Sequence, residues 1–290
     1  MYRKKGIIKK GVIMKTNYKS SGISMAIAST LRFKKEGLPL IEKPKPSEYT
    51  IKVANTLEER ADVFRLAYQV YLSKGFLKAN TNEWLVNDYD ADTSTTILIV
   101  KDKNNRLVGS VTLVFDGYSK LPAQKIYGKE IQILRTSKEK IAEISRLIIN
   151  PEFRNSKEIL VLLFNYLAIY ASHVMHYTCL SIEVNPRHKL YYKELLGFTE
   201  IGDEKPCPIV ENAPATLLYV PLSKLHSEVV RCQNQANHDK KERTLYQYFL
   251  KPEQNSLVAH YLKAQSKAMS AEEKLYFGFT ESGISRIACV

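Results

Sequence analysis

The 290 residues are enough for one large domain, or for one domain with appendages. A hydrophobic fraction of 44% and an aromatic fraction of 10% exclude a disordered chain and indicate a packed core. The sequence contains no run of about 18 apolar residues, so no membrane-spanning helix is expected. The basic N-terminus lacks the apolar centre of a signal peptide. We therefore expect a cytoplasmic protein.

The net charge of +13 is concentrated in the first part of the chain. Residues 1–47 contain 12 Lys and Arg and 2 acidic residues, whereas residues 48–290 contain 31 and 28. This distribution argues against nucleic-acid binding by the folded body and predicts a disordered basic tail and linker over residues 1–47. A tail of this charge also suits anionic lipid, so a peripheral contact with the inner membrane surface stays open.

The cysteines are far apart and show no C-x-x-C spacing, which predicts free thiols and no metal site. They are Cys179, Cys207, Cys232 and Cys289.

The folded part begins after a proline-rich linker that ends near Ser47. Thr56 fits an N-cap, and Glu59 completes a capping box, which together predict a helix start. Apolar periodicity indicates the other elements. In chain order we predict a strand at 49–53, a helix at 57–72, a loop at 78–92, a hairpin from 96–101 and 107–115, an irregular excursion at 117–136, a strand at 141–149, a helix at 156–176, a strand at 179–184, a helix at 187–195, and strands after 198 and at 215–220.

This element order predicts an α/β (α+β) fold, in which helices flank a mixed central sheet. After Pro221 the pattern becomes helical, which predicts a C-terminal helical extension over residues 223–290.

The most informative strand is the segment AEISRLIIN at 142–150. A carboxylate, Glu143, and a guanidinium, Arg146, interrupt an otherwise apolar run. Burying either group costs several kcal/mol unless it is paired or used. Residues 143 and 146 of a regular strand point to opposite faces, so a β-bulge would be needed to re-aim one of them. A buried ion-pair network with a purely structural role is the alternative.

Six short motifs add to this reading. They are NDYD at 87–90, LVGSVTL at 107–113, AEISR at 142–146, VNPRH at 184–188, LGF at 196–198 and APA at 213–215. Together they resemble the long-chain N-acyl amino acid synthase family, a branch of the GCN5-related N-acetyltransferase (GNAT) fold that is related to the acyl-homoserine lactone synthases. The resemblance implies a GNAT-like acyltransferase domain over residues 48–222, which transfers a fatty acyl group from an acyl-carrier-protein thioester to the α-amine of an amino acid.

The resemblance also implies catalytic roles. Glu143 is expected to be the general base, because an ammonium group has no lone pair with which to attack a thioester. Arg146 is expected either to hold the substrate carboxylate or to fix Glu143 and Asp90. Tyr192 is expected to protonate the leaving thiolate.

The other expected site residues bind substrate. The backbone around Leu147 and Ile148 is expected to hold the oxyanion, and His188 is expected to be a cap or a second base. The remaining substrate-binding candidates are Trp84, Asn87, Asp90, Ser145 and Asn185.

The absence of glycine after the key strand bears on the donor. Acetyl-CoA-using relatives cradle the pyrophosphate with a glycine-rich turn at the helix start. Here the segment reads RNSKE at 154–158, and Glu158 adds repulsion toward phosphate. We therefore expect no bound cofactor and an acyl donor on the phosphopantetheine of acyl carrier protein, with acyl-CoA less favoured. The basic residues expected to meet that acidic partner are Arg154, Lys157, Arg187 and Lys189.

Asn87 bears on the acceptor, since autoinducer synthases usually have Asp at this position. Loss of that carboxylate disfavours a cationic sulfonium-bearing substrate and favours an ordinary amino acid. A simpler reading is that Asp88 and Asp90 cap a turn. Two other functions stay open: an autoinducer (acyl-homoserine lactone) synthase, and a non-catalytic GNAT-like domain that binds lipid or a carrier protein.

Overall fold

The computed structural model describes residues 48–117, 120–153, 156–234, 243–280 and 283–284. The predictions for the basic tail and for Arg154 and Cys289 therefore concern residues outside the described ranges.

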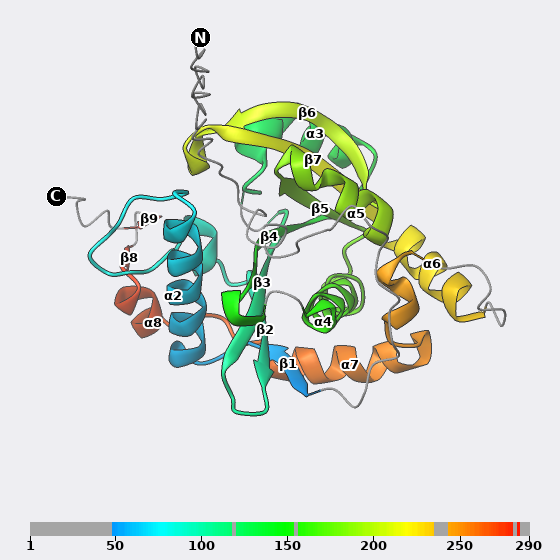
Figure 1. The fold of residues 1–290 in the computed structure, drawn as a ribbon, viewed down its shortest axis with the longest axis horizontal. Helices are drawn as coiled ribbons and strands as arrows, with labels where there is room; N and C mark the ends of the chain where they lie inside the picture. Colours follow the sequence, from blue (N-terminus) through cyan, green and yellow to red (C-terminus); the bar gives the residue numbers. More distant parts are fainter. Residues whose placement is uncertain (1–47, 118–119, 154–155, 235–242, 281–282, 285–290) are drawn as a thin grey trace, which may run out of the picture.

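A seven-stranded mixed sheet forms the centre of the molecule (Figure 1). The spatial order of its strands is β1-β2-β3-β4-β5-β7-β6. The β4–β5 pair is parallel and the other neighbouring pairs are antiparallel. The strands are β1 (Tyr49–Val53), β2 (Thr96–Asp102), β3 (Leu107–Phe115), β4 (Ile141–Ile149), β5 (Cys179–Val184), β6 (Thr199–Cys207) and β7 (Ala213–Pro221). The predicted mixed sheet is confirmed, and a short hairpin, β8 (Phe279–Thr280) with β9 (Gly283–Ile284), stands apart from it.

Seven α-helices are found among the described residues, with several single-turn helices between them. The α-helices are α2 (Leu57–Ser73), α3 (Gln124–Thr136), α4 (Lys157–Ile169), α5 (Lys189–Leu196), α6 (Leu222–Asn234), α7 (Pro252–Gln265) and α8 (Ala271–Tyr276). The short ones are η1 (Asp88–Ala91), η2 (Pro151–Phe153), the π-helix η3 (Tyr170–Val174), η4 (Pro186–His188), η5 (Pro208–Val210) and η6 (Leu245–Tyr248). None of the helices in the described ranges has the length and apolarity needed to cross a membrane.

The helices cover both faces of the sheet (Figure 1). Ala142 and Ile144 of β4 belong to the core that α4 covers. The alternate residues face the opposite side, where Ile141 packs under α3 and Ile148 packs under α2. The face under α2 and α3 is therefore the one toward which Glu143 projects.

The start of α2 differs slightly from the expected capping box. The Thr56 hydroxyl accepts a bond from the Glu59 N–H at 3.3 Å, as predicted. The Glu59 carboxylate, however, accepts from the Asn55 N–H at 3.2 Å. The helix start is thus capped from both sides, although the reciprocal bond reaches one residue further back than a capping box requires.

The prediction of an irregular excursion at 117–136 is wrong, because this segment contains α3, Gln124–Thr136. Tyr127 departs from helical geometry (φ −116°, ψ 33°), so two helical pieces join there at a kink. Tyr127 and Ile131 are buried against the sheet at helical spacing. The kink and the adjacent Gly128 hide that periodicity in the sequence.

The three cysteines in the described residues, Cys179, Cys207 and Cys232, are free thiols, as predicted.

Candidate active site

Arg146 lies at a β-bulge in β4. In the β3–β4 ladder, Thr112 pairs with Ser145. The next pair is Ser110 with Ile148, so one residue of β3 opposes two residues of β4. Arg146 has a φ of +42°, in the left-handed region where a residue with a side chain is strained. This bulge turns the Arg146 side chain to the face that Glu143 and Ser145 occupy, which a regular strand would not allow.

The Arg146 guanidinium is fully buried and ion-paired. It donates to both carboxylate oxygens of Asp90, one of them at 2.8 Å. It also donates to the Leu85 carbonyl and to the Thr112 hydroxyl, each at 3.0 Å. Burial raises the pKa of Asp90, and the neighbouring guanidinium counteracts part of that rise. With 1% of its surface exposed, Arg146 has no room for a substrate carboxylate.

Of the two roles expected for Arg146, the structure therefore shows the pairing with Asp90. No contact joins Arg146 to Glu143. The rings of Phe64 and Tyr89 flank the guanidinium, with centroids 5.2 and 5.4 Å from its central carbon. Arg146 thus anchors the η1 loop to the sheet.

Tyr89 connects this loop to the key strand, although the sequence reading did not single it out. Its hydroxyl lies 3.0 Å from the Ser145 hydroxyl and accepts a bond from the Asn87 side-chain amide, also at 3.0 Å. Burial raises the pKa of Tyr89 to about 12, so it is a neutral donor and acceptor at physiological pH. Asp90 accepts from the Asn87 N–H at 2.7 Å, so it caps the turn and pairs with Arg146 at the same time.

Glu143 is buried behind the start of α3. Both of its oxygens accept from the Ala123 N–H, at 3.1 and 3.0 Å, and 1% of the residue is exposed. Burial raises the pKa of Glu143 well above its ordinary range, while the Ala123 N–H opposes that rise. A carboxylate in such surroundings is a strong proton acceptor, which is the property expected of a general base.

A second buried carboxylate, Glu183, was missed by the sequence reading. Glu143 lies opposite Ser181 in the β4–β5 ladder, and Glu183 is two residues further along the same face. Glu183 is 3% exposed, and one of its oxygens has no hydrogen-bond partner among the described residues. Burial raises its pKa, and a hydrogen bond from the Cys207 thiol lowers it in part. The available signal was a carboxylate in an apolar strand, the same pattern that drew attention to Glu143.

The two strands that carry these carboxylates diverge at the site. The β4–β5 ladder ends at the Ile144–Ile182 pair, although β4 continues to Ile149 and β5 to Val184. The later residues of β4 therefore have no β5 partner in the ladder. An oxyanion contact with the backbone of Leu147 and Ile148, as expected from the sequence, requires such an opening. The side chains of both residues are buried in the core.

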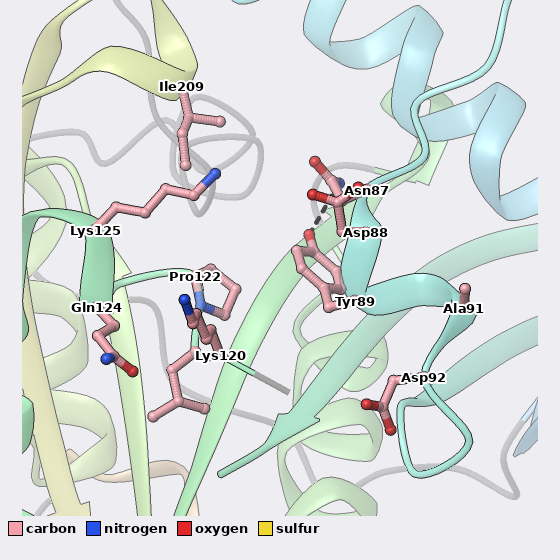
Figure 2. A pocket seen from close by; sticks show the side chains of 11 residues that line it. Asn87, Asp88, Tyr89, Ala91, Asp92, Lys120, Pro122, Gln124, Lys125 and Ile209 are labelled. Carbon is pink, nitrogen blue, oxygen red and sulfur yellow. Dashed lines mark hydrogen bonds between the residues drawn. The ribbon is translucent and has the colours of Figure 1, made fainter. Parts of the chain in front are cut away.

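A cavity of about 680 Å³ lies beside the η1 loop (Figure 2). One wall carries Asn87, Asp88 and Tyr89, and the facing wall carries Lys120 and Lys125. Its remaining lining residues are Ala91, Asp92, Leu121, Pro122, Gln124 and Ile209. The two walls therefore have opposite charge, and Tyr89 links the cavity to Ser145 on β4.

Tyr192 lies away from this site. It is fully buried on the α4 face of the sheet, where its ring packs near those of Phe164 and Phe198 at centroid distances of 6.2 and 6.0 Å. Glu143 projects from the opposite face. The structure therefore does not bring Tyr192 together with the carboxylates.

His188 and Asn185 form the turn after β5. Burial, together with the charges of Arg187 and Lys74, lowers the pKa of His188 to about 3, so its imidazole is too weakly basic to accept an amine proton at physiological pH. Asn185 accepts from the Arg187 N–H at 3.1 Å and donates to the Pro214 carbonyl at 3.0 Å. Asn185 therefore caps the turn, whereas the His188 ring accepts from the Arg187 guanidinium at 3.1 Å and makes no capping bond.

The basic residues expected at a carrier-protein surface lie at the helix starts after β4 and β5. Lys157 opens α4, and burial lowers its pKa. Arg187 is exposed in η4. Lys189 is paired with Glu200 at 2.9 Å. Because the ends of neighbouring parallel strands meet at one edge, Lys157 and Arg187 border the opening between β4 and β5.

A sheet that opens between β4 and β5, with a carboxylate and a bulge on β4, defines a GNAT-like acyltransferase. The family model described as N-acyl amino acid synthase FeeM matches residues 62–221, and the chain belongs to this family. The structure of FeeM, an N-acyl amino acid synthase from uncultured soil microbes, is similar to this chain, with 25% sequence identity and a TM-score of 0.54. That match covers 62% of this chain and 93% of FeeM.

Two other solved structures show weaker likeness. The acyl-homoserine lactone synthase LasI has 17% identity and a TM-score of 0.45, over 60% of this chain and 89% of LasI. The CoA-dependent acyl-homoserine lactone synthase BjaI has 17% identity and a TM-score of 0.48, over 62% of this chain and 89% of BjaI. No curated protein sequence matches the chain.

Proposed function

We propose that the protein is an N-acyl amino acid synthase, which transfers a long-chain fatty acyl group from an acyl-carrier-protein thioester to the α-amine of an amino acid. The observation that carries this proposal is the position of the cavity. It lies beside the η1 loop, and the Tyr89 hydroxyl on its wall contacts Ser145, the first residue of β4 after the β4–β5 ladder ends. An acceptor in the cavity and a thioester in the opening would meet beside the buried carboxylates.

The charges of the two cavity walls suit a zwitterion. Lys120 and Lys125 face the cavity from one side and would receive the acceptor carboxylate. Asn87 and Asp88 on the other side would receive its amine. This arrangement gives the carboxylate a binding partner other than Arg146, whose guanidinium is occupied by Asp90.

Amide formation requires several proton transfers. The acceptor enters as an ammonium group and loses one proton before its nitrogen attacks the thioester carbonyl. As the C–N bond forms and the C–S bond breaks, the nitrogen loses a second proton and the thiolate gains one. We assign the first proton to Glu143, reached through a bridging water. The backbone of Leu147 and Ile148 would stabilise the oxyanion.

Glu183 is the better candidate for the acid that protonates the thiolate. It lies on the same face as Glu143, next to the end of the β4–β5 ladder, and one of its oxygens has no hydrogen-bond partner among the described residues. Tyr192 was expected in this role, but its ring lies on the opposite face of the sheet. Glu143 would thus take the first proton, and the second proton of the nitrogen would pass through water to Glu183, which replaces the one given to the thiolate.

The start of α4 supports a carrier-protein donor. The Ser156 side chain caps the helix by accepting from the Ile159 N–H, and no glycine opens the turn for a pyrophosphate. Lys157 and Arg187 at the edge of the opening would face an acidic carrier protein.

The experiment is product analysis with purified protein and a mixture of amino acids. The donors are one long acyl chain, loaded either on acyl carrier protein or on coenzyme A. We expect N-acyl amino acids, formed faster from the carrier protein, and their loss in Glu143→Gln. The matched control is Glu152→Gln, because this acid follows β4 directly and its side chain is 73% exposed.

Other products would contradict the proposal. Lactones would identify an autoinducer synthase, and no acylated product from either donor would identify a non-catalytic domain. Equal or faster use of acyl-CoA would refute the carrier protein as the preferred donor while leaving the acceptor assignment intact.

A further inference from the structure

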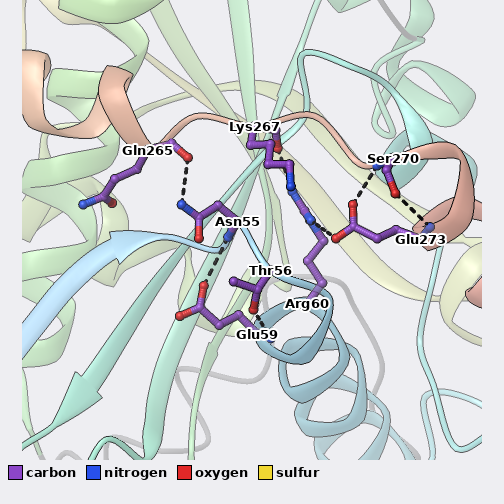
Figure 3. A network of polar contacts seen from close by, with 8 residues as sticks. All are labelled: Asn55, Thr56, Glu59, Arg60, Gln265, Lys267, Ser270 and Glu273. Atoms are coloured by element: carbon purple, nitrogen blue, oxygen red, sulfur yellow. Dashed lines mark hydrogen bonds and ion pairs between the residues drawn. The ribbon is translucent and has the colours of Figure 1, made fainter.

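The segment of residues 265–277, which we call the strap, lies outside the part of the chain that matches the family model. It runs from the last residue of α7 through α8, and it crosses the N-terminal end of α2 (Figure 3). The Gln265 carbonyl accepts from the Asn55 side-chain amide at 3.2 Å. The Lys267 carbonyl accepts from the Arg60 guanidinium at 2.6 Å. The strap is therefore hydrogen-bonded to α2 and to the residue before its cap.

A buried ion pair fastens the next part of the strap. Arg60 of α2 and Glu273 of α8 are 4% and 8% exposed, and they form a salt bridge. The other Glu273 oxygen accepts from the Ser270 N–H at 2.7 Å, and the Ser270 hydroxyl caps the helix in return at 3.1 Å. Removing one partner of a buried ion pair leaves an uncompensated charge, so this contact resists opening.

The end of the strap packs on Trp84, which precedes the η1 loop, and on Phe64 of α2. The Phe277 ring contacts Trp84 and Phe64 at centroid distances of 5.1 and 4.9 Å. The Tyr276 ring contacts Trp84 on another side, also at 5.1 Å. Phe64 in turn lies against the Arg146 guanidinium. A continuous row of rings thus connects the strap to the ion pair at the centre of the site.

Trp84 begins the segment that builds the cavity wall. The next residue, Leu85, donates its N–H to the Phe64 carbonyl at 3.1 Å and accepts from Arg146 through its own carbonyl. The chain then continues through the η1 loop, from which Asn87, Asp88, Tyr89, Ala91 and Asp92 line the cavity. Any loosening of Trp84 or Phe64 would therefore shift the wall that carries Asn87 and Asp88.

We propose that the strap is a positioning element of the acceptor cavity: by clamping Trp84 and Phe64 it holds the η1 loop in the geometry that binds the amino acid. The inference rests on the proposed function for the identity of the ligand. Its contacts lie on the acceptor side of the sheet, so the strap should affect the amino acid and leave the acyl donor unaffected.

The test uses the full chain with two substitutions in the strap, Tyr276→Ala and Glu273→Gln. Tyr276 is 49% exposed, so its truncation removes a ring contact without opening a deep cavity. The matched control is Leu275→Ala, because Leu275 belongs to the same helix and is 74% exposed. The readouts are the KM values for amino acid and acyl donor, and amide hydrogen exchange of residues 84–92. Since Trp84 is the single tryptophan of the chain, its fluorescence reports the contact directly.

We expect both strap variants to raise the KM for the amino acid about tenfold, because small misplacements of a positioned loop are costly. The KM for the acyl donor should stay within about twofold of the wild type. Exchange in the loop should become faster and the Trp84 emission should shift, whereas Leu275→Ala should resemble the wild type in every readout.

An unchanged KM for the amino acid in an active enzyme would overturn the inference, even if the Trp84 emission shifts, since the strap would then be a structural contact only. If the wild type itself shows no acyl transfer, the proposed function fails and hydrogen exchange decides on the strap. Faster exchange of residues 84–92 in the two strap variants alone would support the clamp, and unchanged exchange would refute it.

Discussion

Two groups of buried charges lie on the same face of the sheet, and they differ in how their charges are compensated. Asp90 and Arg146 form an ion pair in which the guanidinium also bonds a carbonyl and a hydroxyl. Glu143 and Glu183 have no cationic partner within the part of the chain that the structure describes; one accepts a backbone N–H and the other a thiol hydrogen. The ion pair therefore builds the site, while the two carboxylates are left able to exchange protons.

This comparison has a physical cause. The Arg146 guanidinium opposes part of the rise that burial causes in the pKa of Asp90, and the hydrogen bonds between them hold the pair in position. A buried carboxyl without a counter-charge instead keeps its proton to higher pH. The following substitutions test whether the two groups behave as differently as their surroundings predict.

The largest effect is expected from breaking the ion pair. Arg146→Met should lower the free energy of unfolding by about 3–5 kcal/mol, because Asp90 would be left buried without its partner. Urea denaturation measures this change. The control is Arg65→Met, which breaks the exposed pair of Arg65 with Asp62 and should leave the unfolding free energy nearly unchanged. Equal losses in the two variants would show that Arg146 and Asp90 are not a stabilising pair.

Neutralising Glu143 should lower activity without lowering stability. Glu143→Gln should lower kcat about 100-fold, as expected for loss of a general base. Its unfolding free energy should stay the same or rise, because the amide oxygen still accepts from Ala123 and no charge has to be buried. Steady-state kinetics and denaturation on the same preparations separate the two effects. A variant that is unfolded, or fully active, would contradict the role of Glu143 as a base.

Glu183 offers a test through pH. Its pKa is raised in the folded protein from an ordinary 4.5, so the folded state retains the proton over a pH range in which the unfolded state has lost it. The stabilisation from this group is therefore present below pH 4.5 and is lost as pH rises toward the folded pKa, by up to about 1.4 kcal/mol per pH unit. The wild type should lose stability relative to Glu183→Gln as pH rises above 4.5. A pH-independent difference between the two would mean that Glu183 has the same pKa in the folded and unfolded states.

The smallest effect concerns the cavity wall. Lys125→Met should raise the KM for the amino acid several-fold and leave kcat little changed. The reason is that a partly solvated ion pair contributes about 1 kcal/mol to binding. Lys129→Met is the control, since Lys129 is exposed on the same helix and does not line the cavity. If both variants behave alike, the carboxylate of the acceptor is bound elsewhere.

Much of the fold could be predicted from the sequence because it depends on local patterns. The apolar run at 141–149 and the hairpin at 96–115 lie where they were expected, since period-2 runs and turn residues act over a few positions. α3 was missed because a kink at Tyr127 breaks its period. The sequence left open whether a β-bulge interrupts β4, and the register shift in the β3–β4 ladder shows that one does.

The candidate site was predicted only in part, because its contacts join distant segments. Glu143 and Arg146 stood out as costly charges in an apolar strand, and Asp90 through its loop motif. The separation of 56 positions between Asp90 and Arg146 hid their pairing. Glu183 and Tyr89 acquire their roles from strand register and from the loop that folds back onto Ser145. Tyr192 was expected near the thioester because the family resemblance implied it, yet its side chain lies in the core on the opposite face of the sheet.

By itself, the sequence determined the order of the elements, the family, and which charges would be costly to bury, since these follow from periodicity, motif and residue type. Only the tertiary structure decided which of those charges are compensated. Strand register placed Glu183 on the same face as Glu143, and the bulge turned Arg146 toward Asp90. The strap, residues 265–277, packs on Trp84 from far along the chain. Compensation depends on distances between groups that are far apart in the chain, and those distances exist only once the sheet and its covering segments have assembled.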